Sequence, residues 1–472
     1  MQARRGRSAR PRARWGALTA WVAALALTAA CTGAGDLAPS PSPSPSASGG
    51  ASTTAATGPV TLRFSVYGDR PVVSAYRALA QAYREQHPEV TVRVEAVPDA
   101  LSQQGRLDRQ FAGDEGPDVF LADSISLPEL VGQGLVRPVD RLLEDRGVQF
   151  GDRYQRLGLE AFAAESALQC MPSSVSPQVV FYNKRLLIPS ALVQPGEEAP
   201  TPETGWTWEQ FVQAARVMSQ DDVKGVYLAP LLTTLTPLLR SAGSDVVDDP
   251  QQPSTLTLAD PDSREALELI LDLARDRRVN LTPAEIERQD PVTRFERGRL
   301  GMFVGTRALV PRLREDPALR FDVFPLPSLG RFRTTAEVTG YCINDSSEVV
   351  DAAADFIAFA SSDEGAEITA RSGGVVPANL AALQSPAFVQ PSQFPRNVDV
   401  FTTVIRRSEP MPNPPGWSDV VSQTAPLLQQ LFYAPLVDLD SLLSRIDALS
   451  TGLLAGPTPT PASPDPTATP ES

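Results

Sequence analysis

The chain has 472 residues, enough for two domains, and its 42 basic and 56 acidic side chains give a net charge of −14. No basic stripe interleaved with aromatic residues occurs, so the composition argues against nucleic-acid binding. The single histidine, His87, leaves no material for a histidine-rich zinc site or a Ser–His–Asp triad. We therefore expect no metal and no cofactor.

The N-terminus has the pattern of an export signal. Six arginines between Arg4 and Arg14 precede an apolar run over residues 15–31, which is too short to span a bilayer comfortably. Its last five residues, Leu27-Thr28-Ala29-Ala30-Cys31, resemble a bacterial lipobox, with Thr28 where Leu is usual. We predict a signal peptide over residues 1–30 and a lipid on Cys31. The alternative is an ordinary secretory signal that ends near a cysteine.

Low-complexity segments flank the body of the chain. Residues 31–58 are rich in Pro and Ser and contain little that a core could bury, so we predict an extended linker. Residues 456–472 have a similar composition, and we predict a disordered tail. The globular body then covers about residues 59–454.

The first half of the body alternates strands and helices. The patterns predict strands over 60–66, 90–97 and 118–123, and helices over 72–86 and 101–112. This order predicts an α/β lobe with right-handed crossovers. Ligands of such sheets bind at the carboxyl ends of the strands, where Tyr67, Asp69 and Asp123 lie.

The second half continues in the same style. The patterns predict strands over 179–184, 321–325 and 338–343, a helix over 207–217 capped by Thr207, a helix end, turn and strand over 295–305, and a helix over 352–360. Outside the cytosol Cys170 and Cys342 can form a disulfide, or they can remain two buried thiols. Their spacing does not decide between the two.

Five segments, taken in order, resemble those of the bacterial extracellular solute-binding proteins that serve ABC importers. They are Tyr67-Gly68-Asp69, 116–120, 180–184, 295–305 and 373–378; Met411-Pro412-Asn413-Pro414-Pro415, followed by Trp417, is similar to the maltose- and multiple-sugar-binding branch. The resemblance covers about residues 60–450. It implies an α/β periplasmic-binding-protein fold, in which two lobes joined by three hinge crossings hold a ligand between them.

The resemblance also implies where the lobes divide. The crossings fall at 168–172, 338–342 and 371–375, so lobe one is 59–170 plus 341–371 and lobe two is 172–339 plus 374–454. Cys170 and Cys342 then lie on the first two crossings, which run side by side in this family. The resemblance therefore implies a disulfide between them that stiffens the hinge.

Residues that suit a sugar occur near these positions. Carboxylates accept short hydrogen bonds from hydroxyls, and aromatic rings offer flat apolar surfaces. We predict ligand contacts from Tyr67, Asp69, Asp123, Met171, Gly243, Arg307, Tyr341 and Trp417. The alternatives are core packing for Tyr67 and Trp417, a helix cap for Asp69, and a surface ion pair with Asp316 for Arg307.

The function implied by the resemblance is binding and not catalysis. A sugar or related polyol closes the lobes, and the closed protein, expected as a lipid-anchored monomer on the outer face of the membrane, delivers the solute to an ABC permease. Two alternatives remain. A secreted glycoside hydrolase needs two carboxylates at a defined separation, which no local motif pairs. A ligand sensor for a membrane receptor has the same fold and site.

Overall fold

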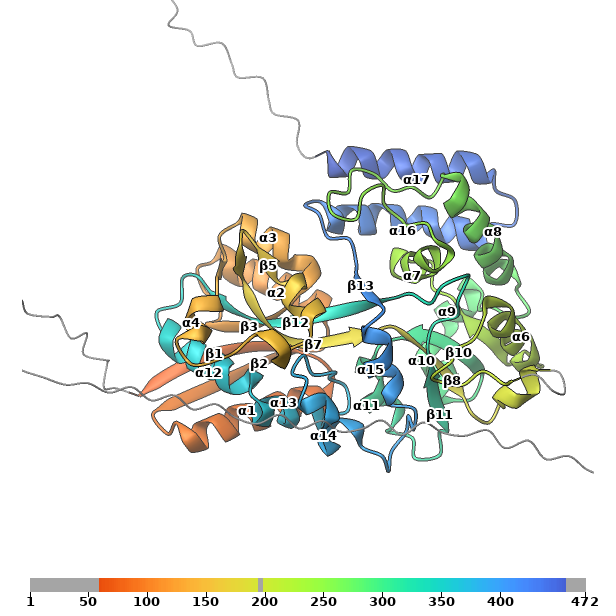
Figure 1. Cartoon of the computed structure of the whole chain (residues 1–472). Helices are drawn as coiled ribbons and strands as arrows, with labels where there is room; N and C mark the ends of the chain where they lie inside the picture. The colour runs from red at the N-terminus through yellow and green to blue at the C-terminus, as the bar shows by residue number, and fades with distance from the viewer. Residues whose placement is uncertain (1–58, 194–197, 456–472) are drawn as a thin grey trace, which may run out of the picture. The chain divides into compact units, whose positions relative to one another are not determined.

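The structure is a computed structural model that describes residues 59–193 and 198–455 (Figure 1). The predicted signal peptide, the lipid site at Cys31, the linker up to residue 58 and the tail over 456–472 lie outside the described residues. Within the described part of the chain, no helix is long and apolar enough to cross a membrane.

The strands and helices alternate along much of the chain. The strands are β1 Val60–Tyr67, β2 Val90–Val97, β3 Val119–Asp123, β4 Val136–Arg137, β5 Ala163–Ala164, β6 Ala167–Leu168, β7 Cys170–Pro177, β8 Val179–Asn183, β9 Lys224–Tyr227, β10 Leu300–Gly305, β11 Phe321–Phe324, β12 Thr334–Asn344 and β13 Ser408–Pro410.

The helices follow the same chain order. They are α1 Arg70–Gln86, α2 Ala100–Ala112, α3 Leu127–Gly132, α4 Asp140–Glu144, α5 Arg156–Ala161, α6 Trp208–Met218, α7 Leu232–Ala242, α8 Pro261–Arg275, α9 Pro283–Arg288, α10 Pro291–Glu296, α11 Val310–Leu313, α12 Val350–Ser361, α13 Asp363–Ala370, α14 Pro386–Val389, α15 Asp399–Ile405, α16 Trp417–Tyr433 and α17 Leu439–Leu454.

The first lobe is built on a sheet ordered β13-β12-β3-β1-β2, with β4 and β7 also paired to β12. β1 is parallel to β2 and β3, whereas β12 runs antiparallel to β3. Along β3, Val119 and Leu121 pack in one hydrophobic cluster with α1 and α12, while Phe120 and Ala122 pack in another with α2 and α3. Successive strand residues face opposite sides of a sheet, so burial of both faces explains why this strand is apolar throughout.

The second lobe is built on a sheet ordered β11-β8-β10-β9. Val180 and Tyr182 of β8 pack in a cluster with residues of α6, α7, α8, α16 and α17. Val179 and Phe181 pack on the opposite face, in a cluster with residues of α11, α14 and α15. This sheet is therefore also covered on both faces.

Local signals set the ends of several elements. Thr207 and Gln210 form a reciprocal capping box at the start of α6, as the predicted N-cap requires. Gly298 has φ of +69° in the turn between α10 and β10, a conformation that favours glycine. The predicted strands and helices are confirmed, with ends displaced by four residues or fewer.

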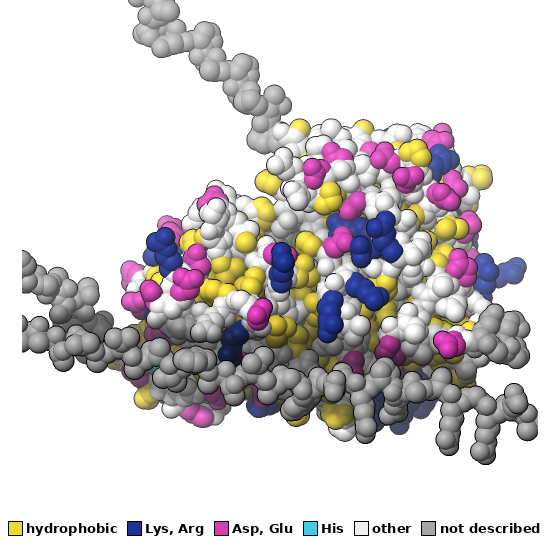
Figure 2. Space-filling model, viewed as in Figure 1, with side chains coloured by type: hydrophobic (Ala, Val, Ile, Leu, Met, Phe, Trp, Pro, Cys, Tyr) yellow, Lys and Arg dark blue, Asp and Glu magenta, His cyan; other side chains and the backbone are white. Residues whose placement is uncertain are grey.

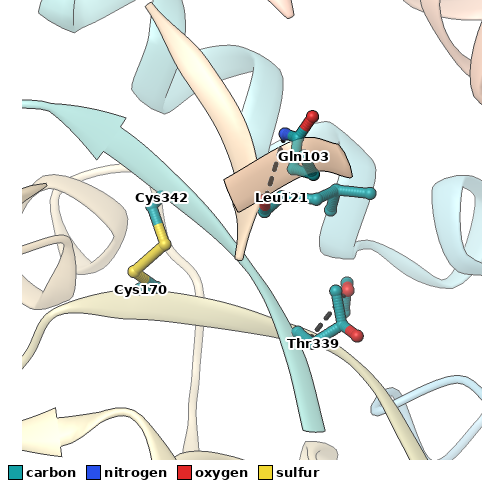
Figure 3. Close-up of a disulfide and its surroundings, with 6 residues drawn as sticks. Gln103, Leu121, Cys170, Thr339 and Cys342 are labelled. Atoms are coloured by element: carbon teal, nitrogen blue, oxygen red, sulfur yellow. Dashed lines mark hydrogen bonds between the residues drawn. A yellow bond between two sulfur atoms is a disulfide. The ribbon is translucent and has the colours of Figure 1, made fainter. Parts of the chain in front are cut away.

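Two long strands join the lobes, as the centre of Figure 1 shows. β7 leads directly into β8, and β12 follows β11, so each strand connects one sheet to the other. They pair antiparallel from Cys170 opposite Cys342 to Pro177 opposite Ala336. A disulfide links Cys170 and Cys342, with an S–S distance of 2.02 Å (Figure 3).

Candidate functional site

Polar side chains meet where β1 and β3 of the first sheet end beside the middle of β12. Tyr67 is the last residue of β1 and Asp123 the last of β3. Thr339 of β12 is the register partner of Asp123. The hydroxyls of Tyr67 and Thr339 are hydrogen-bonded at 3.1 Å. The sheet topology thus brings two predicted site residues, Tyr67 and Asp123, to one place.

Glu337 extends this group toward the second lobe. It lies two residues before Thr339 on β12, so both side chains leave the same face of the strand. Thr306, in the turn after β10, donates a hydrogen bond from Oγ1 to Oε2 of Glu337 at 3.3 Å. We call Tyr67, Asp123, Thr306, Glu337 and Thr339 the interlobe polar group.

The two carboxyl groups of this group have altered acidity. Burial raises the pKa of Glu337 to about 7; the hydrogen bond from Thr306 opposes this shift and the charge of Asp123 adds to it. Burial also raises the pKa of Asp123, against the backbone N–H groups of Ile125 and Ser126 that donate to it. Burial further raises the pKa of Tyr67.

The surroundings explain these shifts. Glu337 is exposed to solvent, yet enough protein surrounds its side chain to disfavour the charged form. Among the ion pairs of the described residues, none involves Glu337 or Asp123. The pair can accept hydrogen bonds from hydroxyls, and at neutral pH Glu337 can also donate one.

A pocket in the first lobe adjoins the interlobe polar group. It lies between α2 and α3, and its lining includes Tyr67, Gln103, Leu121, Asp123 and Leu130. Gln103 is held in place from both ends, because its Oε1 accepts from Ser65 Oγ at 3.1 Å and its Nε2 donates to the Leu121 carbonyl at 3.3 Å. Figure 3 shows the bond to Leu121. The polar wall of the pocket is therefore fixed before any ligand arrives.

Two predicted residues lie outside the interlobe polar group. Asp69 caps α1, where its Oδ1 accepts from the Val72 N–H at 3.3 Å; burial raises its pKa. Gly243 ends α7 with φ of +107° and lines a different, solvent-exposed pocket, with Asp262 and Glu265. The cap accounts for Asp69 and the left-handed backbone accounts for Gly243.

The other four predicted residues are buried in this structure. Met171 and Tyr341 pack in the first-lobe core, 0% and 2% exposed, and Trp417 packs in the second-lobe core at 2%. Buried side chains of this kind offer no surface to a ligand in this structure. Within the described residues, no large exposed hydrophobic side chain is aromatic.

Arg307 is the most unexpected of the four. Its side chain is fully buried, with Nε donating to the Gly373 carbonyl at 2.9 Å and Nη2 to the Phe388 carbonyl at 2.8 Å. The guanidinium carbon lies 4.1 Å from the centre of the Phe388 ring. Burial, with a smaller contribution from Arg314, lowers the pKa of Arg307 to about 9. Arg307 thus joins the second lobe to the segment around Gly373, in place of the surface pair with Asp316.

Sequence reasoning missed Thr306, Glu337 and Thr339. Thr306 follows the predicted strand over 295–305, and Glu337 directly precedes the predicted strand over 338–343, so their loop and strand-end positions were the available signal. Across the described ranges, no group of three His, Cys, Asp or Glu residues could hold a metal ion.

Comparison with known proteins gives a family and a fold. The family model for bacterial extracellular solute-binding proteins matches residues 78–396. Comparison with curated protein sequences gives no match.

Solved structures of similar fold cover most of the chain. An ABC substrate-binding protein of Listeria monocytogenes in complex with cycloalternan has a TM-score of 0.74 at 19% identity, covering 84% of this chain and 99% of that one. The GacH receptor of Streptomyces glaucescens, solved unliganded and with acarbose, has a TM-score of 0.70 at 18% identity, covering 84% and 98%. A maltotriose-binding protein of Thermus thermophilus has a TM-score of 0.67 at 17% identity, covering 83% and 99%. These likenesses show the two-lobe fold, and the family match shows that the chain belongs to the bacterial extracellular solute-binding proteins.

Proposed function

We propose that this protein binds a sugar or related polyol between its two lobes and delivers it to the membrane permease of an ABC importer. The observation that carries the proposal is the interlobe polar group, in which Asp123 of the first lobe and Glu337 on a connecting strand have no ion-pair partner among the described residues. The family membership and the sugars named in the similar structures support the same ligand class.

The chemistry of the group suits a hydroxylated ligand. Adjacent hydroxyls can donate to Asp123 and Glu337, and such bonds are strong where the accepting carboxyl group is ionised. The half-buried ring of Tyr67 supplies an apolar surface beside them. Because the large exposed hydrophobic side chains of the described chain include no aromatic ring, we favour a monosaccharide or a short oligosaccharide over a long chain.

Closure of the lobes supplies the mechanism. We propose that lobe one comprises 59–170 plus 341–371 and lobe two 172–339 plus 374–454, with hinge crossings at 168–172, 338–342 and 371–375. A ligand that touches Asp123 and Thr306 together contacts both lobes, so it favours the closed arrangement by its additional contacts there. The permease then distinguishes the closed form from the open one.

The site of action is outside the cytoplasm, as the family is extracellular. We further propose that a lipid on Cys31 anchors the protein and that residues 32–58 are the tether. The protein would act as a monomer and without catalysis, as a carrier of solute.

A thermal-shift screen of residues 58–455 tests the proposal. Mono- and oligosaccharides, polyols and amino acids are the ligands, and the double variant Asp123→Asn/Glu337→Gln is the comparison. A ligand at ~100 times its dissociation constant stabilises the fold by about 2.7 kcal/mol, which raises the unfolding midpoint measurably. We expect one class of sugar or polyol to give a saturable shift in the unfolding midpoint. The shift should be smaller in the double variant.

Other results of the screen, together with three further assays, separate the alternative functions. If only amino acids raise the unfolding midpoint, or if no tested compound does, the sugar assignment is contradicted. The fold assignment is not affected by either result. Release of product from a chromogenic glycoside, suppressed in the double variant, indicates a hydrolase. Sugar binding with capture of a receptor, and no uptake defect on deletion, indicates a sensor.

A further inference from the structure

Arginines gather where β12 and β13 begin, on a protein that is acidic overall. Arg331, Arg333, Arg406 and Arg407 lie within a few residues of the parallel pair Thr334–Ser408. Figure 2 shows Lys and Arg side chains grouped in the middle of this face, around the position of β13 in Figure 1. We call these four residues the arginine patch.

The backbone holds the arginine patch together. The Thr334 N–H bonds to the Arg407 carbonyl at 3.5 Å, which sets the start of β12 beside the start of β13. The Arg407 guanidinium lies 5.5 Å from the centre of the Phe332 ring. The Arg331 N–H donates to the Ser241 carbonyl at 3.0 Å, and Ser241 Oγ donates in turn to the Arg331 carbonyl. The charges are therefore presented by an ordered surface.

Few acids neutralise this surface. Glu409 bonds to Arg333 at 3.1 Å and lies 3.5 Å from the buried Arg240, whose closer partner is Asp245 at 2.7 Å. In the described ranges Arg331, Arg406 and Arg407 have no ion-pair partner, and all three side chains are exposed. The patch therefore keeps an excess of positive charge.

We infer that the arginine patch docks on the anionic phospholipid headgroups of the membrane that carries the protein. Guanidinium groups bind phosphate with paired hydrogen bonds, which suits a headgroup layer. Since the chain has a net charge of −14 and six of its basic residues precede residue 15, the rest of the body is acidic and is repelled by such a layer. The patch would thus set which face of the body turns to the membrane.

The inference rests on the proposed anchoring at Cys31. A tether of about 27 residues keeps the body near the lipid surface, so weak contacts suffice to orient it. The described strands, helices and hydrophobic clusters all lie within residues 59–455, and the test therefore uses this body.

The test replaces the natural anchor with an N-terminal polyhistidine tag bound to nickel-chelating lipid. Vesicles contain phosphatidylcholine with or without 30% phosphatidylglycerol and an acceptor dye. A donor dye is placed on Thr403→Cys, exposed near the patch, or on Ser74→Cys, exposed on α1. We expect phosphatidylglycerol to increase energy transfer from position 403 but not from position 74, and 0.5 M salt to abolish the increase.

Charge reversal supplies the control. The variant Arg331→Glu/Arg406→Glu/Arg407→Glu should lose the increase, whereas Arg77→Glu/Arg84→Glu/Arg93→Glu, three exposed arginines elsewhere on the first lobe, should keep it. Equal transfer from both dye positions, or an increase that survives reversal of the patch, overturns the inference and leaves a protein partner as the occupant. The artificial tether makes the result independent of Cys31, and the thermal-shift screen reports ligand binding separately.

Discussion

Glu337 shows how one residue can join two parts of the proposed binding site. Its backbone belongs to a strand of the first sheet, while its carboxylate accepts from Thr306 beside the second sheet. Protein around it raises its pKa to about 7, from an ordinary value near 4.5. A residue with this acidity changes charge in the range where an extracellular protein works.

The raised pKa of Glu337 predicts a dependence of stability on pH. Between about pH 4.5 and 7 the folded state holds this proton more often than the unfolded state, so the free energy of unfolding decreases as pH rises through that window. Glu337→Gln cannot titrate and should remove this component. We expect the unfolding midpoint of the wild type to fall relative to that of Glu337→Gln as the pH is raised from 5 to 7.5.

Comparison with the variant is necessary because another carboxyl group, that of Asp447, titrates in a similar pH range. Burial raises the pKa of Asp447 to about 6, and that contribution is common to both proteins. Thermal unfolding at half-unit steps of pH measures the difference. Parallel curves for the two proteins would show that Glu337 is not perturbed.

At the scale of elements, the sequence predicted the strands and helices better than the site. Alternation identifies β1 and β2, and apolar runs identify β3 and β8 because both faces of these last two strands are buried. Glu337 interrupts the apolar pattern of β12, so the predicted strand began at residue 338 and left this carboxylate outside. Side-chain depth also escaped prediction: Tyr341 and Thr339 share a face of β12, but helices cover only Tyr341.

The capping box at Thr207 gives a direct test of local structure. Thr207→Ala removes the acceptor for the Gln210 N–H, a bond of 3.3 Å, at the start of α6. Loss of such a cap costs about 1 kcal/mol. Urea unfolding should show this decrease for Thr207→Ala and a change within about 0.5 kcal/mol for Thr403→Ala, an exposed threonine inside α15. Equal free energies of unfolding for the two variants would show that the Thr207 cap does not stabilise the protein.

The disulfide between β7 and β12 should stabilise the pair of connecting strands. It closes a loop with a sequence separation of 172 residues, and restricting so long a loop in the unfolded chain contributes about 2–5 kcal/mol. Cys170→Ala/Cys342→Ala should lose that amount in urea unfolding. Thiol titration of the unreduced, unfolded wild-type body should find neither cysteine free. Two free thiols, or an unchanged free energy of unfolding, would contradict this assignment.

At the scale of the whole molecule, the proposed third crossing between the lobes, at residues 371–375, depends on a glycine. A Cβ on Gly374 would lie 2.9 Å from Val72 Cγ2 of α1 and 3.0 Å from Pro311 Cγ of α11, so helices of the two lobes approach each other across this residue. Gly374→Ala should force them apart and disfavour the closed arrangement. Because ligand binding draws on closure, the apparent affinity should fall, by roughly 10-fold if the closed state loses about 1.4 kcal/mol.

The steric clash that the new Cβ creates can be relieved without restoring the glycine. Val72→Ala deletes the methyl group that the new Cβ meets, so Gly374→Ala/Val72→Ala should recover affinity relative to Gly374→Ala alone, whereas Gly151→Ala, where no atom lies within 4 Å, should bind normally. Titration of the sugar or polyol identified by the thermal-shift screen measures the affinities, and small-angle X-ray scattering with saturating ligand measures closure. A single variant that binds and closes like wild type would mean that the lobes do not move about this crossing, whereas failure of the double variant to recover would place the effect in the backbone at residue 374 itself.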